Sequence, residues 1–246
     1  MNAVWGFGLL RLLLIACKVL YREFCYYAAV SRNLVELRFL KQGLHNEPTK
    51  LRECAQTEID AADESGAYDA ILLGYGLCSN GVEGLRSSKH KIVIPRAHDC
   101  ITFFLGSKER YARYFEDHPG TYWYTPGWIE TDGAADRPRY DAVYREYMEK
   151  YGEDNARYIF EVLQSWTKHY DRAAYMDLGF CDNTTYRDHT KNVAAERGWE
   201  YVEVDGDPSL VIDLLEGNWD AERFLVLEPG ETVRATHDER ILGVLP

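Results

Sequence analysis

The sequence predicts an α/β fold in which a doubly wound, mostly parallel sheet has helices on both faces and carries an aromatic-rich helical insertion. Short apolar runs alternate with longer amphipathic segments, a pattern that is typical of βαβ units. The alternation stops at about 120–139 and resumes after two tyrosine-rich helical segments. Four cysteines lie just past the ends of predicted strands, so we expect a site at one edge of the sheet.

The position of each element follows from apolar periodicity and from turn signals. Strands are predicted at 10–16, 34–40, 68–75, 91–95, 174–178, 201–204 and 224–227. Helices are predicted at 19–30, 49–64, 81–87, 101–116, 140–151 and 154–170. Pro48 supports the start of the second helix, because proline fits the first helical turn. Pro229-Gly230 predicts a hairpin turn near the C-terminus.

The break in the alternation divides the chain into three predicted parts. We expect a first α/β half at 9–120, an aromatic loop and helical insertion at 121–172, and a second α/β half at 173–246. Together these parts are expected to form one compact domain. The aromatic residues of the insertion recur at three- or four-residue spacing, which is more typical of a packing surface than of a cofactor site.

Length and charge exclude several classes of protein. The 246 residues suffice for one large α/β domain or two small ones with an ample core. The net charge of −12 repels phosphate backbones, so we expect no nucleic-acid partner. No apolar run approaches the length of a membrane span, so we expect no membrane association. Oligomeric state does not follow from these numbers.

The cysteine content indicates a reducing compartment. Six cysteines are too few for a disulfide-stapled secreted scaffold of this length, so a cytoplasmic location is predicted. The segment 14–17, Leu-Ile-Ala-Cys, resembles a lipoprotein cleavage box. However, the apolar run at 12–16 is shorter than the roughly 7–15 residues of a secretory signal, and a helical pattern follows it directly. A buried strand is therefore predicted there.

The strand-end cysteines are the candidate metal ligands. If the strands are parallel neighbours, their carboxyl ends share an edge, and residues far apart in sequence meet in one pocket. Thiolates bind zinc and iron–sulfur clusters because they are soft anionic donors. The alternative is that cysteine here is only a small buried hydrophobe, as we expect for Cys25 and Cys54. The predicted ligands are Cys17, Cys78, Cys100 and Cys181.

Histidine and acidic residues accompany these cysteines. His98 and Asp99 directly precede Cys100, and Glu23 lies within two helical turns of Cys17. A neutral imidazole ligates borderline metals or relays protons, and a carboxylate serves in acid–base chemistry. We therefore predict catalytic roles for His98, Asp99 and Glu23, although solvated helix charges and structural histidines are the common alternative.

A glycine-containing segment after the third predicted strand is the candidate cofactor loop. The run Gly-Tyr-Gly-Leu-Cys-Ser-Asn-Gly at 74–81 lacks the third glycine of a dinucleotide loop and the Gly-Lys-Ser/Thr of a P-loop. Its glycines instead allow a sharp turn and a close approach of backbone to ligand. Together with a pair that follows the second strand, the predicted cofactor-binding residues are Gly74, Gly76, Ser79, Asn80, His45 and Asn46.

These same segments resemble the family known as domain of unknown function 1638, from anaerobic bacteria and archaea. The matching runs are Ile-Ala-Cys-Lys-Val-Leu-Tyr-Arg-Glu at 15–23, the loop at 74–81, His-Asp-Cys-Ile at 98–101 and Asp-Leu-Gly-Phe-Cys at 177–181. Two further runs, at 104–111 and 119–123, extend the resemblance over nearly the whole chain. The resemblance brings no settled activity. It implies a companion of corrinoid-dependent methyl-transfer systems, with a corrinoid as a candidate cofactor.

The function predicted from the sequence is metal binding. We expect a cytoplasmic α/β protein that holds zinc or an iron–sulfur cluster and acts in corrinoid-linked methyl transfer as a metal-dependent group transferase. Its partner would be a small molecule or a corrinoid protein. Two alternatives stay open, namely a non-catalytic metal or corrinoid carrier and a metal-free enzyme with a cysteine nucleophile. Whether the chain is an enzyme at all is not decided by these residues.

Overall fold

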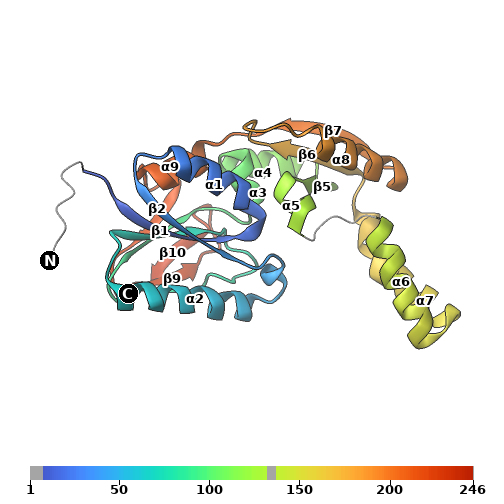
Figure 1. Ribbon diagram of the computed structural model, residues 1–246, viewed down its shortest axis with the longest axis horizontal. Coiled ribbons are helices and arrows are strands. Elements are labelled where there is room, and N and C mark those ends of the chain that lie inside the picture. Colours follow the sequence, from blue (N-terminus) through green and yellow to red (C-terminus); the bar gives the residue numbers. More distant parts are fainter. Residues whose placement is uncertain (1–7, 132–136, 246) are drawn as a thin grey trace. The chain divides into compact units, whose positions relative to one another are not determined.

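The computed structural model describes residues 8–131 and 137–245 (Figure 1). The chain divides into two compact units. Unit 1 comprises the described residues of 1–112 and 206–246, and unit 2 comprises those of 113–205. The region near the C-terminus therefore returns to the first unit, and each unit has its own sheet.

A five-stranded sheet forms the centre of unit 1. Its strands are β1 (Arg11–Cys17), β2 (Leu34–Leu40), β3 (Ala70–Gly74), β4 (Lys91–Pro95) and β8 (Phe224–Leu227). The order is β2-β1-β3-β4-β8, with the first four strands parallel and β8 antiparallel to β4. The carboxyl ends of β1, β3 and β4 consequently lie next to one another at one edge.

Helices lie on both faces of this sheet. Figure 1 shows α2 (Pro48–Ser65) along one face and α1 (Tyr21–Val30) and α9 (Ser209–Glu216) along the other. The α2 helix begins at Pro48 and ends before Gly66, which has the left-handed φ of 59° that glycine accommodates. Its buried apolar residues recur every three or four positions and pack on the alternate residues of β1, β3 and β4 that face it. They are Leu51, Ala55, Ile59 and Ala62.

Shorter elements complete unit 1. The 3-10 helices η1 (Lys18–Leu20) and η2 (Leu44–Asn46) follow β1 and β2, and α3 (Ile101–Leu105) follows β4. Two further strands, β9 (Thr232–Ala235) and β10 (Leu242–Leu245), pair antiparallel. The helix α4 (Lys108–Asp117) lies where the chain passes from unit 1 to unit 2.

Unit 2 has a three-stranded parallel sheet in the order β5-β6-β7. The strands are β5 (Thr121–Tyr124), β6 (Arg172–Asp177) and β7 (Glu200–Asp205). Tyr124, Tyr175 and Val193 belong to the core that this sheet forms with α8. The helices of unit 2 are α5 (Pro126–Thr131), α6 (Arg137–Tyr151), α7 (Glu153–Gln164), η3 (Ser165–His169) and α8 (Thr184–Arg197).

The predicted α/β class and the mostly parallel strands are confirmed. The doubly wound arrangement and the aromatic insertion remain predictions. The predicted helix at 81–87 is wrong, because this segment forms turns and a single bridge residue. The predicted helix at 101–116 is two helices, since Gly106 ends α3 with a left-handed φ of 79°.

Two further expectations near strands are also corrected. The loop expected from 120 contains the strand β5, in which Thr-Tyr-Trp-Tyr has high β-propensity. The hairpin around Pro229-Gly230 does not form, because β8 pairs with β4 while β9 pairs with β10. In the part of the chain that the structure describes, no helix has both the length and the apolar composition that a membrane span requires.

Candidate functional site

Two loops meet at the carboxyl ends of adjacent strands in unit 1. The loop after β3 is joined to the loop after β4 by hydrogen bonds from Leu77 N to Ala97 O (2.8 Å) and from Cys78 N to His98 O (2.9 Å). Gly76 makes this approach possible, because a Cβ there would lie 2.7 Å from the backbone N of Asp99. The backbone therefore fixes Cys78 beside the segment that leads to Cys100.

The backbone is strained in the residues that directly follow Leu77. Cys78, Ser79 and Asn80 are consecutive residues other than glycine with positive φ, at 46°, 57° and 65°. The left-handed conformation costs roughly 1–2 kcal/mol for such a residue. The Arg52 guanidinium holds the turn by donating to Asn80 O (3.0 Å), and Gly81 N donates to Cys78 O (3.0 Å). Strain of this kind is concentrated at ligand-binding and catalytic sites.

Three of the four predicted metal ligands lie close together. Cys17 is the last residue of β1, and it packs with Cys78 against the core on the α2 face. Burial, followed by the charges of Asp99 and Cys17, raises the pKa of Cys78 to about 12. Burial, followed by Asp99, Cys17 and Cys78, raises the pKa of Cys100 well above its usual value. The structure thus gathers neighbouring acidic groups, and without a cation these thiols are protonated at neutral pH.

Asp99 is fixed by hydrogen bonds to both carboxylate oxygens. The Tyr111 hydroxyl donates to Oδ2 and the Ile101 amide donates to Oδ1, each at 2.9 Å. Burial raises the pKa of Asp99, although these hydrogen bonds act in the opposite direction. His45 is half-buried nearby, where burial lowers its pKa and the charge of Asp99 partly offsets that shift. Asp99 therefore borders the thiols, and His45 interacts electrostatically with Asp99.

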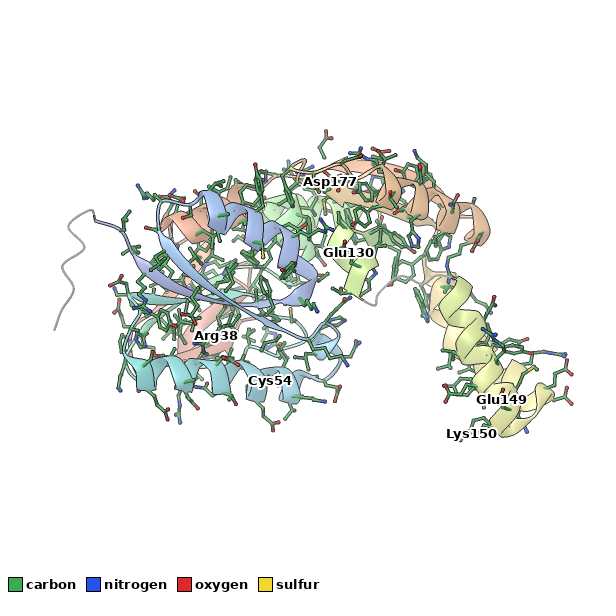
Figure 2. All side chains as sticks on the ribbon, viewed as in Figure 1. Arg38, Cys54, Glu130, Glu149, Lys150 and Asp177 are labelled. Atoms are coloured by element: carbon green, nitrogen blue, oxygen red, sulfur yellow. The ribbon has the colours of Figure 1, made fainter. Side chains whose placement is uncertain are left out.

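Tyr75 is the residue that the sequence reasoning missed. It is 3% exposed, belongs to the core cluster against which Cys17 and Cys78 pack, and interacts electrostatically with the site thiols and with Cys54. Cys54, labelled on α2 in Figure 2, packs against the same core. A tyrosine between two glycines directly after a fully buried strand was the available signal.

Other predicted residues have different surroundings. His98 has an exposed side chain whose ring centroid lies 5.9 Å from that of Tyr111. Ser79, Asn80 and Asn46 are exposed. Gly74 serves close packing, because a Cβ there would lie 2.5 Å from the Cβ of Ala16.

Two of the predicted site residues lie outside the group formed by Cys17, Cys78 and Cys100. Glu23 is fully buried on α1, where it interacts electrostatically with Cys25 and Tyr27. Cys181 belongs to unit 2, and its thiol donates a hydrogen bond to Asn183 Oδ1 at 2.9 Å. A role for either residue beside the other thiols stays a prediction.

Comparison with known proteins identifies a family. The family model described as Protein of unknown function (DUF1638) matches residues 39–215, which is most of the chain. The chain belongs to the DUF1638 family. No curated protein and no solved structure matches it. The matched region of this DUF1638 protein contains Cys78 and Cys100, whereas Cys17 precedes it.

The donor chemistry of the DUF1638 site suits a thiophilic metal. Thiols, an imidazole and a carboxylate are ligands for zinc and other borderline ions. Within residues 8–131 and 137–245, however, no three histidine, cysteine or acidic side chains are already positioned around one point as a metal requires. Metal binding here would therefore need these side chains to change position.

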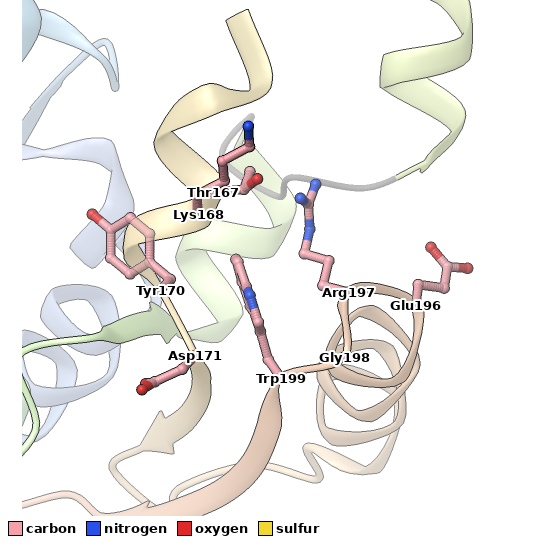
Figure 3. Close-up of a pocket in the computed structure, with 8 residues that line it drawn as sticks. All are labelled: Thr167, Lys168, Tyr170, Asp171, Glu196, Arg197, Gly198 and Trp199. Carbon is pink, nitrogen blue, oxygen red and sulfur yellow. The ribbon is translucent and has the colours of Figure 1, made fainter. Parts of the chain in front are cut away.

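Unit 2 of the DUF1638 protein has a separate aromatic pocket of about 460 Å³ (Figure 3). Trp199 and Tyr170 contribute rings whose centroids are 6.0 Å apart, and the Arg197 guanidinium lies 5.2 Å above the Trp199 ring. The pocket lies at the amino ends of β6 and β7, while open α/β sheets bind ligands at the carboxyl ends. Lys168, Asp171 and Glu196 give it mixed charge. We assign it no ligand.

Proposed function

We propose that this DUF1638 protein binds a thiophilic metal ion, either zinc or the iron of an iron–sulfur cluster, through Cys17, Cys78 and Cys100. The observation that carries the proposal is the convergence of these thiols at the ends of three adjacent parallel strands, β1, β3 and β4. Asp99 borders them and offers a further donor, and His45 interacts electrostatically with Asp99. The sequence-based prediction that Cys181, a residue of unit 2, is a further ligand stays separate from this proposal, which needs only the three thiols of unit 1.

The strand order supports the position of the site. In a doubly wound sheet, a ligand binds where successive connections leave a strand in opposite directions. In unit 1 the chain goes from β1 to β2 on one side and then to β3 on the other side of β1. We propose that unit 1 is doubly wound and that its switch point, between β1 and β3, holds the metal. We further propose that α6 and α7, which pack on each other, form the helical insertion.

The raised pKa values of the thiols favour a metal site over a metal-free site in which a cysteine is the nucleophile. A nucleophilic cysteine needs a lowered pKa, which a neighbouring cation or a helix N-terminus supplies. Here burial and Asp99 act in the opposite direction on Cys78 and Cys100. A bound cation would reverse this effect and stabilise the thiolates. The metal-free enzyme is therefore the weaker proposal.

The reaction we propose is group transfer. A thiolate-bound metal acts as a Lewis acid that activates a nucleophile near neutral pH. Asp99, held by hydrogen bonds from Tyr111 and Ile101, would orient the nucleophile or accept its proton. The exposed His98 would exchange protons with solvent. We propose the methyl group of a corrinoid or a corrinoid protein as the group transferred, in the reducing cytoplasm. A non-catalytic carrier would bind the same metal without turnover.

Metal analysis of anaerobically prepared protein tests the proposal. The wild-type chain should contain close to one equivalent of zinc, or iron with sulfide. Cys17→Ser, Cys78→Ser and Cys100→Ser should each reduce affinity by more than the roughly 10- to 100-fold cost of losing an outer-shell contact. The matched control is Cys25→Ser on α1, which should keep its metal. Folded wild-type protein without affinity for Zn²⁺, Fe²⁺ or Co²⁺ would contradict the proposal, and Cys181→Ser in the same assay decides the fourth ligand.

A further inference from the structure

The strand β2 is a long free edge of the sheet in unit 1. Among the described residues it pairs only with β1, in parallel register over all seven of its residues. None of the seven is buried, whereas three of the four residues of β8, the strand at the opposite edge, are buried. A regular and mainly apolar edge strand of this length presents a row of backbone groups that can pair with another strand.

The hydrogen bonding between β1 and β2 shows which backbone groups of β2 are free. Leu34 N donates to Leu10 O at 2.9 Å, so the N–H and C=O groups of Leu34 face β1. Successive residues of a strand direct these groups to alternate sides. Val35, Leu37 and Phe39 therefore direct their N–H and C=O groups away from β1, toward the free edge.

The sequence of β2 is complementary to itself when two copies run antiparallel. A two-fold axis at Leu37 places Glu36 opposite Arg38 of the second copy, and this pair occurs twice. Opposed residues on either side of a hydrogen-bonded pair have Cα atoms only about 4.5 Å apart, so these opposite charges come close. The same register places Val35 opposite Phe39, a β-branched and aromatic pair that also stabilises antiparallel strands. An axis at Val35 or Phe39 would not pair the two charges.

The edge strand β7 of unit 2 shows the opposite pattern of charge. It carries Glu200, Glu203 and Asp205 without a basic residue, and a two-fold axis at the outward-facing Glu203 would place this carboxylate opposite its own copy. Such repulsion protects an edge from association. In β2, by contrast, Arg38 (labelled in Figure 2) has its Nη2 2.9 Å from Glu36 Oε1 of its own chain. The two side chains are 29% and 44% exposed, so a second copy can reach both charges.

We propose that this DUF1638 protein forms a two-fold dimer in which the β2 strands of two copies pair antiparallel about Leu37 and join the two sheets into one. Each copy uses the long free edge of its unit 1, so the assembly closes as a dimer, and the short, buried β8 strands end the joined sheet. Exposed apolar side chains flank the contact. Leu34 is 64% exposed, and the 48% exposed Tyr21 has its ring centroid 5.0 Å from that of Phe39.

Sedimentation velocity of the full chain tests the proposal. Wild type should sediment as a dimer at micromolar concentration. Glu36→Arg and Arg38→Glu each place like charges opposite one another twice, and each should raise the dissociation constant of the dimer about 10- to 100-fold. An equimolar mixture of these two variants should dimerise again, because every facing pair in the mixed dimer is oppositely charged.

A second variant tests the axis itself. Leu37→Lys places two ammonium groups opposite each other at the axis and should give a folded monomer, as lysine does on protected edge strands. The matched control is Val202→Lys in the edge strand β7, which should still sediment as a dimer. A wild-type chain that stays monomeric, a Leu37→Lys chain that dimerises as wild type does, or two folded charge variants that stay monomeric when mixed would each overturn the inference. None of these results depends on metal content, so they leave the metal proposal to its own test.

Discussion

The segment that connects β3 to β4 begins and ends in buried polar clusters of opposite character. At its far end, next to the start of β4, Asp63 of α2 accepts hydrogen bonds from the Ser87 hydroxyl (2.5 Å) and the Ser88 amide (2.6 Å). His90 Nδ1 lies 2.8 Å from the same carboxylate. Asp63, Ser87 and His90 are all buried. This cluster is complete without any ligand, and we regard it as structural.

The cluster at the near end of the segment, directly after β3, is incomplete, because not all of its buried polar groups are hydrogen-bonded. Tyr75 has a buried hydroxyl without a partner among the described residues, and Cys78 and Cys100 interact electrostatically with one carboxylate, that of Asp99, and with neighbouring thiols. The backbone there is also left-handed over three residues. Since one segment contains both clusters, overall flexibility does not account for the difference. Proteins tolerate unsatisfied and strained groups mainly where function requires them, which favours the thiol end as the position of the ligand that we propose.

The largest effect we expect comes from Gly76→Ala. The added Cβ would meet the backbone of Ala97, His98 and Asp99 at 2.7–2.9 Å, and backbone cannot move aside as a flexible side chain can. We expect a loss of about 3 kcal/mol of unfolding free energy, typical of severe overpacking, together with loss of metal affinity. Urea denaturation and Co²⁺ titration measure the two effects.

A glycine near the Asp63 cluster provides the control for that substitution. Gly66 has a φ of 59° but no atom within 4 Å of an added Cβ, so Gly66→Ala introduces only backbone strain. We expect a loss of about 1 kcal/mol and unchanged metal affinity. Equal destabilisation by both variants would show that close packing of the two loops is not what fixes the thiol site.

The second prediction concerns the pH dependence of the complete cluster. Burial raises the pKa of Asp63, but hydrogen bonds from Ser87, His90 and Ser88 outweigh burial and lower it from 3.8 to about 2. Because the folded pKa lies below the unfolded one, the stabilisation is fully present above about pH 4 and is lost as the pH falls toward 2. Wild type should lose about 2 kcal/mol more than Asp63→Asn over this range.

Urea denaturation of both proteins at a series of pH values between 5 and 2 measures this difference. The comparison with Asp63→Asn removes the contribution of the other carboxylates, which titrate in both proteins. Parallel stability curves would mean that the hydrogen bonds to Asp63 do not stabilise the ionised form. The polar groups of the Asp63 cluster would then be no better satisfied by hydrogen bonds than those at the thiol end of the segment.

Much of this arrangement could be predicted from the sequence, because it depends on local patterns. The strands at 34–40, 91–95 and 224–227 were predicted with the observed bounds, since the last two are short and mainly apolar and the first alternates apolar residues with Glu36 and Arg38. The grouping of Cys17, Cys78 and Cys100 followed from one rule, that parallel strands share their carboxyl edge. Hydrophobic periodicity and strand direction were sufficient for both.

Features that depend on tertiary pairing could not be predicted in this way. The partner of β8 is β4, which lies more than a hundred residues earlier, and the local Pro-Gly signal indicated a hairpin instead. The unpaired hydroxyl of Tyr75 depends on what surrounds it in three dimensions, and no spacing rule reveals that. Asp63 and His90 were likewise not singled out, because their hydrogen bonds join the end of α2 to the start of β4.

The smallest effect we expect tests the strain at the thiol end. Ser79 is exposed and has a φ of 57°, a conformation that glycine adopts without steric cost. Ser79→Gly should therefore raise the unfolding free energy by about 0.5–1 kcal/mol, because relief of strain exceeds the added entropy of the unfolded chain. Ser31→Gly is the control, since Ser31 has a φ of −67° and its hydroxyl accepts a hydrogen bond from Asn33 N, so that variant should lose stability. Denaturation of both variants by urea decides the matter. A loss of stability in Ser79→Gly would mean that the left-handed run is not strained, and the contrast between the two ends of the segment would then rest on Tyr75 and the grouped acids alone.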